Sequence, residues 1–171
     1  MAALAKPQPA TAEPAAVRLA GGTTGDSASA EALRRLHGAL ADLRAEAVVP
    51  MLQEALARLK AHDMAGGAEW AIKALEYDES NGYGWYVLAI AREKAGDFAM
   101  AVRCYERALV LLPDASEIAN DLGRLAYRLG LLPVAEKLFA RYLAANPGAV
   151  EGVNNLACTL RDQARFDDAI E

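Results

Sequence analysis

The sequence predicts an all-α fold, a solenoid built from antiparallel helix pairs. The first observation is a 34-residue period in which a leucine recurs, at Leu88, Leu122 and Leu156. A period of this length is typical of solenoids, in which one helix pair cannot bury its apolar face without a neighbour. The second observation is that further residue types keep the same register: Ala101, Ala135 and Ala169; Gly96, Gly130 and Ala164; Tyr105 and Phe139; Pro113 and Pro147.

Composition agrees with a small helical array. The 171 residues are 54% hydrophobic and 24% charged, so an apolar core can form without a disulfide framework. A net charge of -5 argues against nucleic acid as a partner, which requires a clustered basic surface. Cys104 and Cys158 lie in different repeats without metal-ligand spacing, which favours a reducing compartment. No apolar run approaches the roughly 18 residues of a membrane span, so we expect a cytoplasmic protein with no membrane partner.

The composition changes at about residue 27. Residues 1–27 are rich in Ala, Pro, Thr and Gly and predict a disordered tail, because they cannot bury enough apolar surface to offset their ordering entropy. Ser27 or Ser29 is suited to cap the helix that follows. We assign residues 28–47 to a helix that packs ahead of the array.

Leucines at spacings of three and four residues form an apolar stripe along one face of this helix. It covers fewer than the three or four heptads that a coiled coil requires. We therefore favour packing against the array, and self-association through the stripe stays open as an alternative. The stripe consists of Leu33, Leu36, Leu40 and Leu43.

Residues 48–81 predict a degenerate helix pair. Pro50 is well placed in the first turn of its first helix, where the missing N–H costs nothing. Counting back one period places Glu54 in the leucine column and Gly67 in the alanine column. Terminal repeats often depart from the pattern in this way.

Two complete repeats and part of a third follow. Residues 82–115 and 116–149 keep every column, and Gly96 is expected to turn the chain between the two helices of its repeat. Residues 150–171 start a third repeat whose second helix is cut at Glu171. We therefore expect the chain to be an N-terminal piece of a longer protein.

These columns match the pattern W-x2-L-G-x2-Y, A-x3-F and P of the tetratricopeptide repeat, so the chain resembles a TPR protein. It departs from the pattern at Ala119 and Ala126, where the family prefers aromatic residues, and at Tyr142, where it prefers alanine. The resemblance implies a right-handed superhelix in which the first helix of each repeat lines a concave groove. It also implies that the groove binds a segment of a partner protein.

The resemblance places an apolar, aromatic stretch at one end of the groove and a polar continuation after it. Side-chain amides can hydrogen-bond the backbone of an extended peptide while the aromatic rings contact its side chains. The alternative, that these residues form ordinary solvated helix faces, stays open. The candidate binding residues are Tyr83, Tyr86, Val87, Ile90, Asn120, Asp121, Arg124, Arg128, Asn154 and Asn155.

Two TPR subclasses can be compared with these positions. The chaperone-binding subclass holds a peptide carboxylate with Lys and Asn where this chain has Tyr86 and Ile90, so we exclude binding of chaperone C-termini. The last repeat, with Val-Asn-Asn-Leu-Ala at residues 153–157, resembles the superhelical TPRs of O-GlcNAc transferase and SPINDLY-type glycosyltransferases. Asn155 occupies their asparagine-ladder position, whereas Asp121 and Val87 do not match it.

No pattern in residues 1–171 predicts catalysis. His37 and His62 are solitary, and no nucleophile set, phosphate-binding glycine loop, metal cluster or cofactor motif occurs. We expect a protein–protein interaction module without a cofactor. The alternative is the substrate-recruiting N-terminal region of a larger enzyme, a bacterial protein O-glycosyltransferase with its catalytic domain beyond residue 171.

Overall fold

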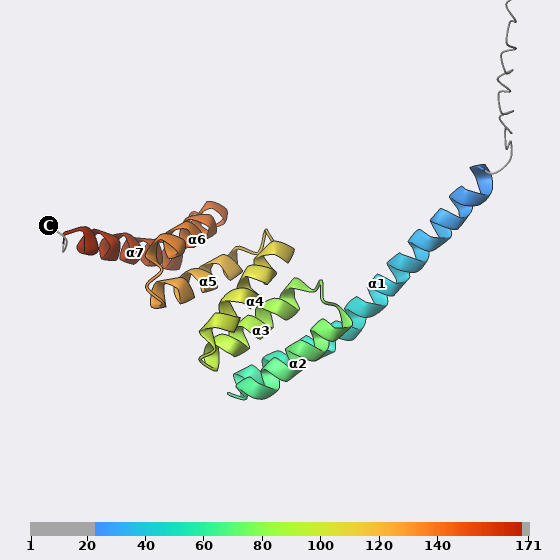
Figure 1. Cartoon of the computed structure of the whole chain (residues 1–171), viewed down its shortest axis with the longest axis horizontal. Helices are drawn as coiled ribbons and strands as arrows, with labels where there is room; N and C mark the ends of the chain where they lie inside the picture. The colour runs from blue at the N-terminus through green and yellow to red at the C-terminus, as the bar shows by residue number, and fades with distance from the viewer. Residues whose placement is uncertain (1–22, 169–171) are drawn as a thin grey trace, which may run out of the picture. The chain divides into compact units, whose positions relative to one another are not determined.

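The computed structural model describes residues 23–168, with side chains described for residues 30–164 (Figure 1). Within this range the chain forms α-helices and no strand, which confirms the expected all-α fold. The disordered tail predicted for residues 1–27 lies mostly outside the described residues. The helices are α1 (Thr23–Lys60), α2 (Met64–Tyr77), α3 (Gly82–Lys94), α4 (Phe98–Leu111), α5 (Ser116–Arg128), α6 (Leu132–Ala145) and α7 (Val150–Asp168).

The helices pack as a linear array. From α2 onward each helix contacts the next one along the chain, and α5 also contacts α7. Short turns join α3 to α4 and α5 to α6, so these partners are antiparallel, as a solenoid of helix pairs requires. We call α3, α5 and α7 the first helices, and α4 and α6 the second helices. Among the described helices, none combines the length and apolar character of a transmembrane span.

The structure differs from the sequence expectation along α1. The helix already includes Thr23, and it continues through Pro50 instead of restarting there. Pro50 removes one backbone hydrogen bond, but the alanine- and leucine-rich residues around it favour helix. Leu40 and Leu43 are 42% and 62% exposed, so the expected packing of the stripe against the array is not seen at these two leucines.

Capping and turn residues explain where the array's helices begin and end. Asp97 is the N-cap of α4, and its carboxylate accepts a hydrogen bond from the Met100 amide at 3.2 Å. Gly96, just before it, has a φ of +83°, and Gly130 has a φ of +74° at the same place in the next repeat. The glycine column therefore marks left-handed residues that end the first helices, as predicted.

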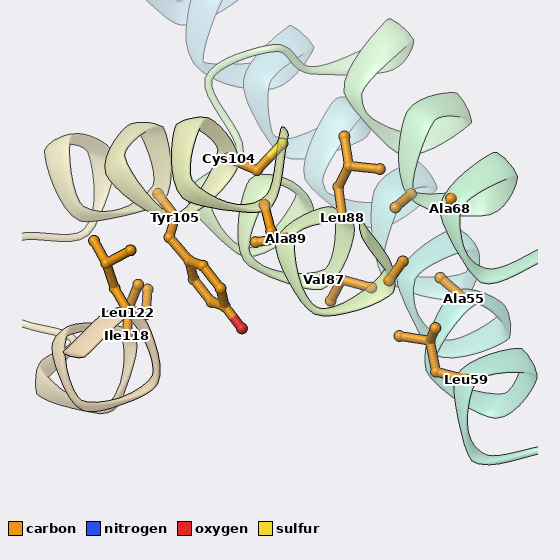
Figure 2. Packing of buried hydrophobic residues seen from close by; sticks show 14 of the residues in the cluster. Ala55, Leu59, Ala68, Val87, Leu88, Ala89, Cys104, Tyr105, Ile118 and Leu122 are labelled. Carbon is orange, nitrogen blue, oxygen red and sulfur yellow. The ribbon is translucent and has the colours of Figure 1, made fainter. Parts of the chain in front are cut away.

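The core follows the predicted columns. Ala101 and Ala135 are fully buried where second helices cross their partners, and Leu88 and Leu122 are nearly so. Figure 2 shows this core extending from α1 and α2 through α3 to Tyr105 of α4 and the residues of α5. Farther along the chain, Phe139 of α6 forms a second cluster with Ala126 and Ala135.

Candidate functional site

The first helices are joined by polar contacts between residues that lie 35 positions apart. Equivalent positions are 34 residues apart. A separation of 35 therefore means that each side chain contacts the residue directly after its own equivalent on the next first helix. We call these contacts the interhelix ladder. It consists of Tyr86 with Asp121 (2.6 Å), Glu93 with Arg128 (2.8 Å), Asn120 with Asn155 (3.2 Å) and Tyr127 with Asp162.

Two tyrosines support the ladder between α3 and α5: Tyr86 belongs to it, and Tyr105 of α4 contacts it from outside. Tyr86 donates its hydroxyl hydrogen to Asp121, and burial together with that carboxylate raises the pKa of the Tyr86 phenol. Tyr105 of α4 donates its hydroxyl hydrogen to Glu93 at 2.8 Å, while the guanidinium of Arg128 pairs with the same carboxylate. The two tyrosine rings lie 6.1 Å apart in a tilted arrangement. This part of the surface is therefore held in one geometry.

Between α5 and α7 the ladder centres on Asn120. Its amide nitrogen donates to Glu151 at 3.2 Å, and its amide oxygen accepts a hydrogen bond from Asn155. Arg124 lies 3.4 Å from the Glu151 carboxylate and 3.6 Å from that of Asp121. Arg124 thus connects carboxylates on two consecutive first helices.

The structure divides the candidate binding residues by exposure. Val87 is only 4% exposed and Asn120 only 6%, so neither side chain is available to a partner, in contrast to the sequence expectation. Val87 is buried because α3 packs against both α2 and α4, which widens its buried face beyond the leucine column. The half-buried candidates are Tyr86, Ile90, Asp121 and Asn155, and the exposed ones are Tyr83, Arg124, Arg128 and Asn154.

Two cavities open beside the ladder and share Arg124 and Arg128. The first, which we call the polar cavity, measures about 450 Å³. The second, the apolar cavity, measures about 290 Å³ and has mainly carbon in its wall. The polar cavity is also lined by Ile90, Glu93, Lys94, Tyr105 and Asp121, and the apolar cavity by Tyr127, Phe139, Asn155 and Cys158.

Sequence reasoning missed several of these lining residues. Tyr127 lies three residues after Arg124 on the same face of α5, and this spacing could have indicated it. Phe139 could not be found in this way, because it reaches the cavity from the second helix α6. A β-carbon placed on Gly123 would lie 2.7 Å from the Phe139 ring, so glycine at this position lets the ring approach α5.

The chemistry of the site is that of a binding surface. Cys104 is buried, which raises the pKa of its thiol, whereas Cys158 is half-buried in the wall of the apolar cavity. Within the described part of the chain, His, Cys, Asp and Glu side chains form no group of three or more suited to a metal ion. The groups that line the cavities are guanidinium, ammonium, carboxylate, amide and aromatic side chains, together with the thiol of Cys158 and the aliphatic side chain of Ile90.

Comparison with known proteins finds a matching family model and a relative. Residues 86–150 match the family model described as tetratricopeptide repeat. Protein FlbA of Caulobacter vibrioides is 50% identical over 147 residues, which is 86% of this chain and 25% of that protein. The chain therefore spans about a quarter of the length of this relative.

Solved structures share the fold at low sequence identity. The first TPR of Spaghetti (RPAP3) bound to an HSP90 peptide superposes with a TM-score of 0.66 at 20% identity, covering 68% of this chain and 93% of that one. MamA gives 0.66 at 16% identity, over 72% of each chain. The O-GlcNAc transferase of Thermobaculum terrenum gives 0.63 at 17% identity, over 68% of this chain and 22% of that one.

Proposed function

We propose that this chain, which carries tetratricopeptide repeats over residues 86–150, is a protein–protein interaction module that binds a segment of a partner protein along α3, α5 and α7. Repeat solenoids use such extended surfaces for binding. The observation that carries the proposal is the pair of adjoining cavities beside the ladder, which together span consecutive first helices.

The interhelix ladder supports this proposal through the entropy of binding. Binding orders flexible side chains at the interface, and the loss of conformational entropy reduces the binding free energy by about 0.5–1.5 kcal/mol for each of them. Tyr86, Asp121 and Asn155 are already held by hydrogen bonds to the neighbouring first helix. A partner therefore meets a surface whose central side chains are ordered before it arrives.

A groove variant tests the proposal. The variant carries Tyr83→Ala, Arg124→Ala and Asn154→Ala, because all three side chains are exposed and none belongs to the core. We expect it to lose the proteins that the wild-type chain captures from an extract of the source cell, measured by quantitative mass spectrometry.

The matched control changes three exposed residues of the second helices, Arg103→Ala, Arg107→Ala and Lys137→Ala. It should capture the same proteins as the wild type, and far-UV circular dichroism should show equal helicity for all three chains. A groove variant that still captures every partner would contradict the proposal.

A second candidate function is recruitment of a protein substrate to a larger enzyme. Two observations favour it: the alignment covers only 25% of FlbA, and the fold is shared with part of an O-GlcNAc transferase. In this proposal the enzyme is a bacterial protein O-glycosyltransferase whose catalytic domain follows residue 171. The mass of the native protein tests it, because a native mass near 18.2 kDa leaves no room for such a domain.

Self-association through the leucine stripe is a separate proposal about partners. Leu33, Leu36, Leu40 and Leu43 are all exposed, and isolated helices of this composition gain stability by packing. Light scattering compares the mass of the wild-type chain with that of a Leu33→Asp/Leu40→Asp variant. Equal masses would rule out the stripe as a dimer contact.

The cellular location is also proposed from residue chemistry. Cys104 and Cys158 are both free thiols, and thiols persist in the reducing cytoplasm. Fractionation of the source cell tests this location.

A further inference from the structure

We propose that the partner segment recognised by the groove carries an apolar side chain with a carboxylate two residues away. The apolar side chain enters the apolar cavity, and the carboxylate pairs with Arg124 or Arg128. This inference rests on the proposed function, because it names the chemistry of the segment that the groove binds.

The apolar cavity fits one buried side chain. Its volume of about 290 Å³ lies between α5 and α7, and its wall includes Tyr127, Phe139 and Cys158. Phe139 is almost fully buried and contributes carbon to the wall, because Gly123 leaves space for its ring. Filling such a site with a Leu, Val or Phe side chain removes apolar surface of both partners from water.

The two arginines at the edge of this cavity point to a carboxylate nearby. Arg124 and Arg128 are four residues apart on α5, so they share one face, and their side chains are 50% and 55% exposed. A guanidinium has five N–H donors, and the ion pairs with Glu93, Asp121 and Glu151 occupy only some of them. The remaining donors can bind a carboxylate of the partner.

The position of Arg128 is reinforced from its other side. Its guanidinium lies over the ring of Phe98, 5.1 Å from the ring centre, while its Nη1 atom pairs with Glu93. These contacts hold the charge at the boundary between the two cavities. Lys94 adds a further positive charge on the wall of the polar cavity.

Acidic residues in the same groove favour a peptide over a polyanion. Glu93 and Asp121 line the polar cavity together with the arginines, and the whole chain has a net charge of -5. A nucleic acid would place a row of phosphates against these carboxylates, whereas binding of a polyanion needs a uniformly basic surface. A peptide can place one carboxylate on the arginines and avoid the rest.

The spacing within the segment follows from its conformation. In an extended peptide, residues two apart point to the same side and are separated by about 6.6 Å. Arg124 and Arg128 both line the apolar cavity, so a carboxylate that pairs with either of them lies close to the side chain in that cavity and on the same side of the segment. An apolar residue and an acidic residue two apart can therefore contact the cavity and its edge together.

Cys158 provides a native reporter of occupancy. It lines the apolar cavity and is half-buried, whereas Cys104, the other cysteine of the chain, is 1% exposed. A thiol reagent should therefore modify Cys158 first, and a side chain in the apolar cavity should slow that reaction. The alkylation rate at Cys158 distinguishes binding in this cavity from binding elsewhere.

The test selects peptides from a phage-displayed random library on the full 171-residue chain. We expect enrichment of peptides with an apolar and an acidic residue two apart, and we expect these peptides to slow alkylation of Cys158. At least one of the variants Arg124→Gln and Arg128→Gln should weaken their binding by about two- to fivefold. The charge-matched controls Arg103→Gln and Arg107→Gln, on the exposed face of α4, should leave it unchanged.

Contrary outcomes separate this inference from the proposed function. Peptides that protect Cys158 but lack acidic residues, or bind both arginine variants as tightly as the wild type, would overturn the inference and leave groove binding intact. A single-stranded oligonucleotide that protects Cys158 better than the selected peptides would also overturn it. A library that yields no binder, or only peptides that leave Cys158 unprotected and bind the groove variant normally, would contradict the proposed function itself.

Discussion

Replacing Gly123 with alanine should destabilise the array even though alanine is the better helix former. Gly123 lies inside α5, and a β-carbon there would come within 2.7 Å of the Phe139 Cε1 atom and 2.9 Å of its Cδ1 atom. Such separations are far below ordinary carbon–carbon contact, which is about 3.5–4.0 Å. Phe139 is 1% exposed, so its ring cannot move into solvent to relieve the contact.

Two opposing free energies decide the size of the effect. Glycine to alanine in a helix interior stabilises the folded state by about 1 kcal/mol. Overpacking of a buried contact costs about 1–3 kcal/mol. The difference predicts a net loss of about 0–2 kcal/mol in the free energy of unfolding, and each kcal/mol lowers the Tm by about 2–4 °C at this chain length.

Urea denaturation followed by far-UV circular dichroism measures this loss, and a second background isolates its cause. In a Phe139→Leu chain the smaller side chain leaves room for the new methyl group. Gly123→Ala should therefore be neutral there, or stabilising by up to about 1 kcal/mol. A Gly123→Ala substitution that stabilises both backgrounds equally would refute the packing argument, because the Phe139 ring would then not press on α5.

Three further predictions concern stability. Ala135→Phe should lower the free energy of unfolding by about 1–3 kcal/mol, because this fully buried residue lies where helices cross, and an unchanged Tm would contradict the repeat register. Tyr105→Phe should cost about 0.5–1.5 kcal/mol in chemical denaturation through loss of its hydrogen bond to Glu93, and a double-mutant cycle with Glu93→Gln should show the coupling. The hydrogen bond from the Gly66 amide, and to a smaller extent the one from Arg58, lower the pKa of the Asp63 carboxyl group. The ionised carboxylate therefore stabilises the fold at pH values above its unfolded-state pKa. This contribution is lost as the pH falls through the folded-state pKa. The Tm difference between wild type and Asp63→Ala should therefore shrink on acidification, and a constant difference would show that the charge of Asp63 is not involved.

The sequence was sufficient to predict the array because its columns arise from packing within each repeat. Ala101 and Ala135 are small where helices cross, and Gly96 has the left-handed φ that ends a first helix. These requirements are local and recur with the period. The path of α1 through Pro50 was not predicted, because helix propensity on both sides of a proline competes with the lost hydrogen bond.

The candidate site was less predictable because it depends on contacts between repeats. The exposure of Val87 is set by α2 and α4 together, and that of Asn120 by its hydrogen bonds to α7. The apolar cavity depends on Phe139 from a second helix, which no pattern along the first helices contains. Exposed side chains such as Arg124 and Arg128 were found, because their positions on the helix face are enough to place them.

The interhelix ladder makes the order of the repeats matter. If residues 82–115 were duplicated in tandem, the copy of Val87 would take the place of Asp121 opposite the Tyr86 hydroxyl, which would lose its acceptor. Glu93 would face the copy of Lys94 in place of Arg128, so its partner would still be a positively charged side chain. Gene duplication can therefore lengthen such an array readily where its junctions are charged. At the tyrosine junction a new acidic residue must arise together with the inserted unit.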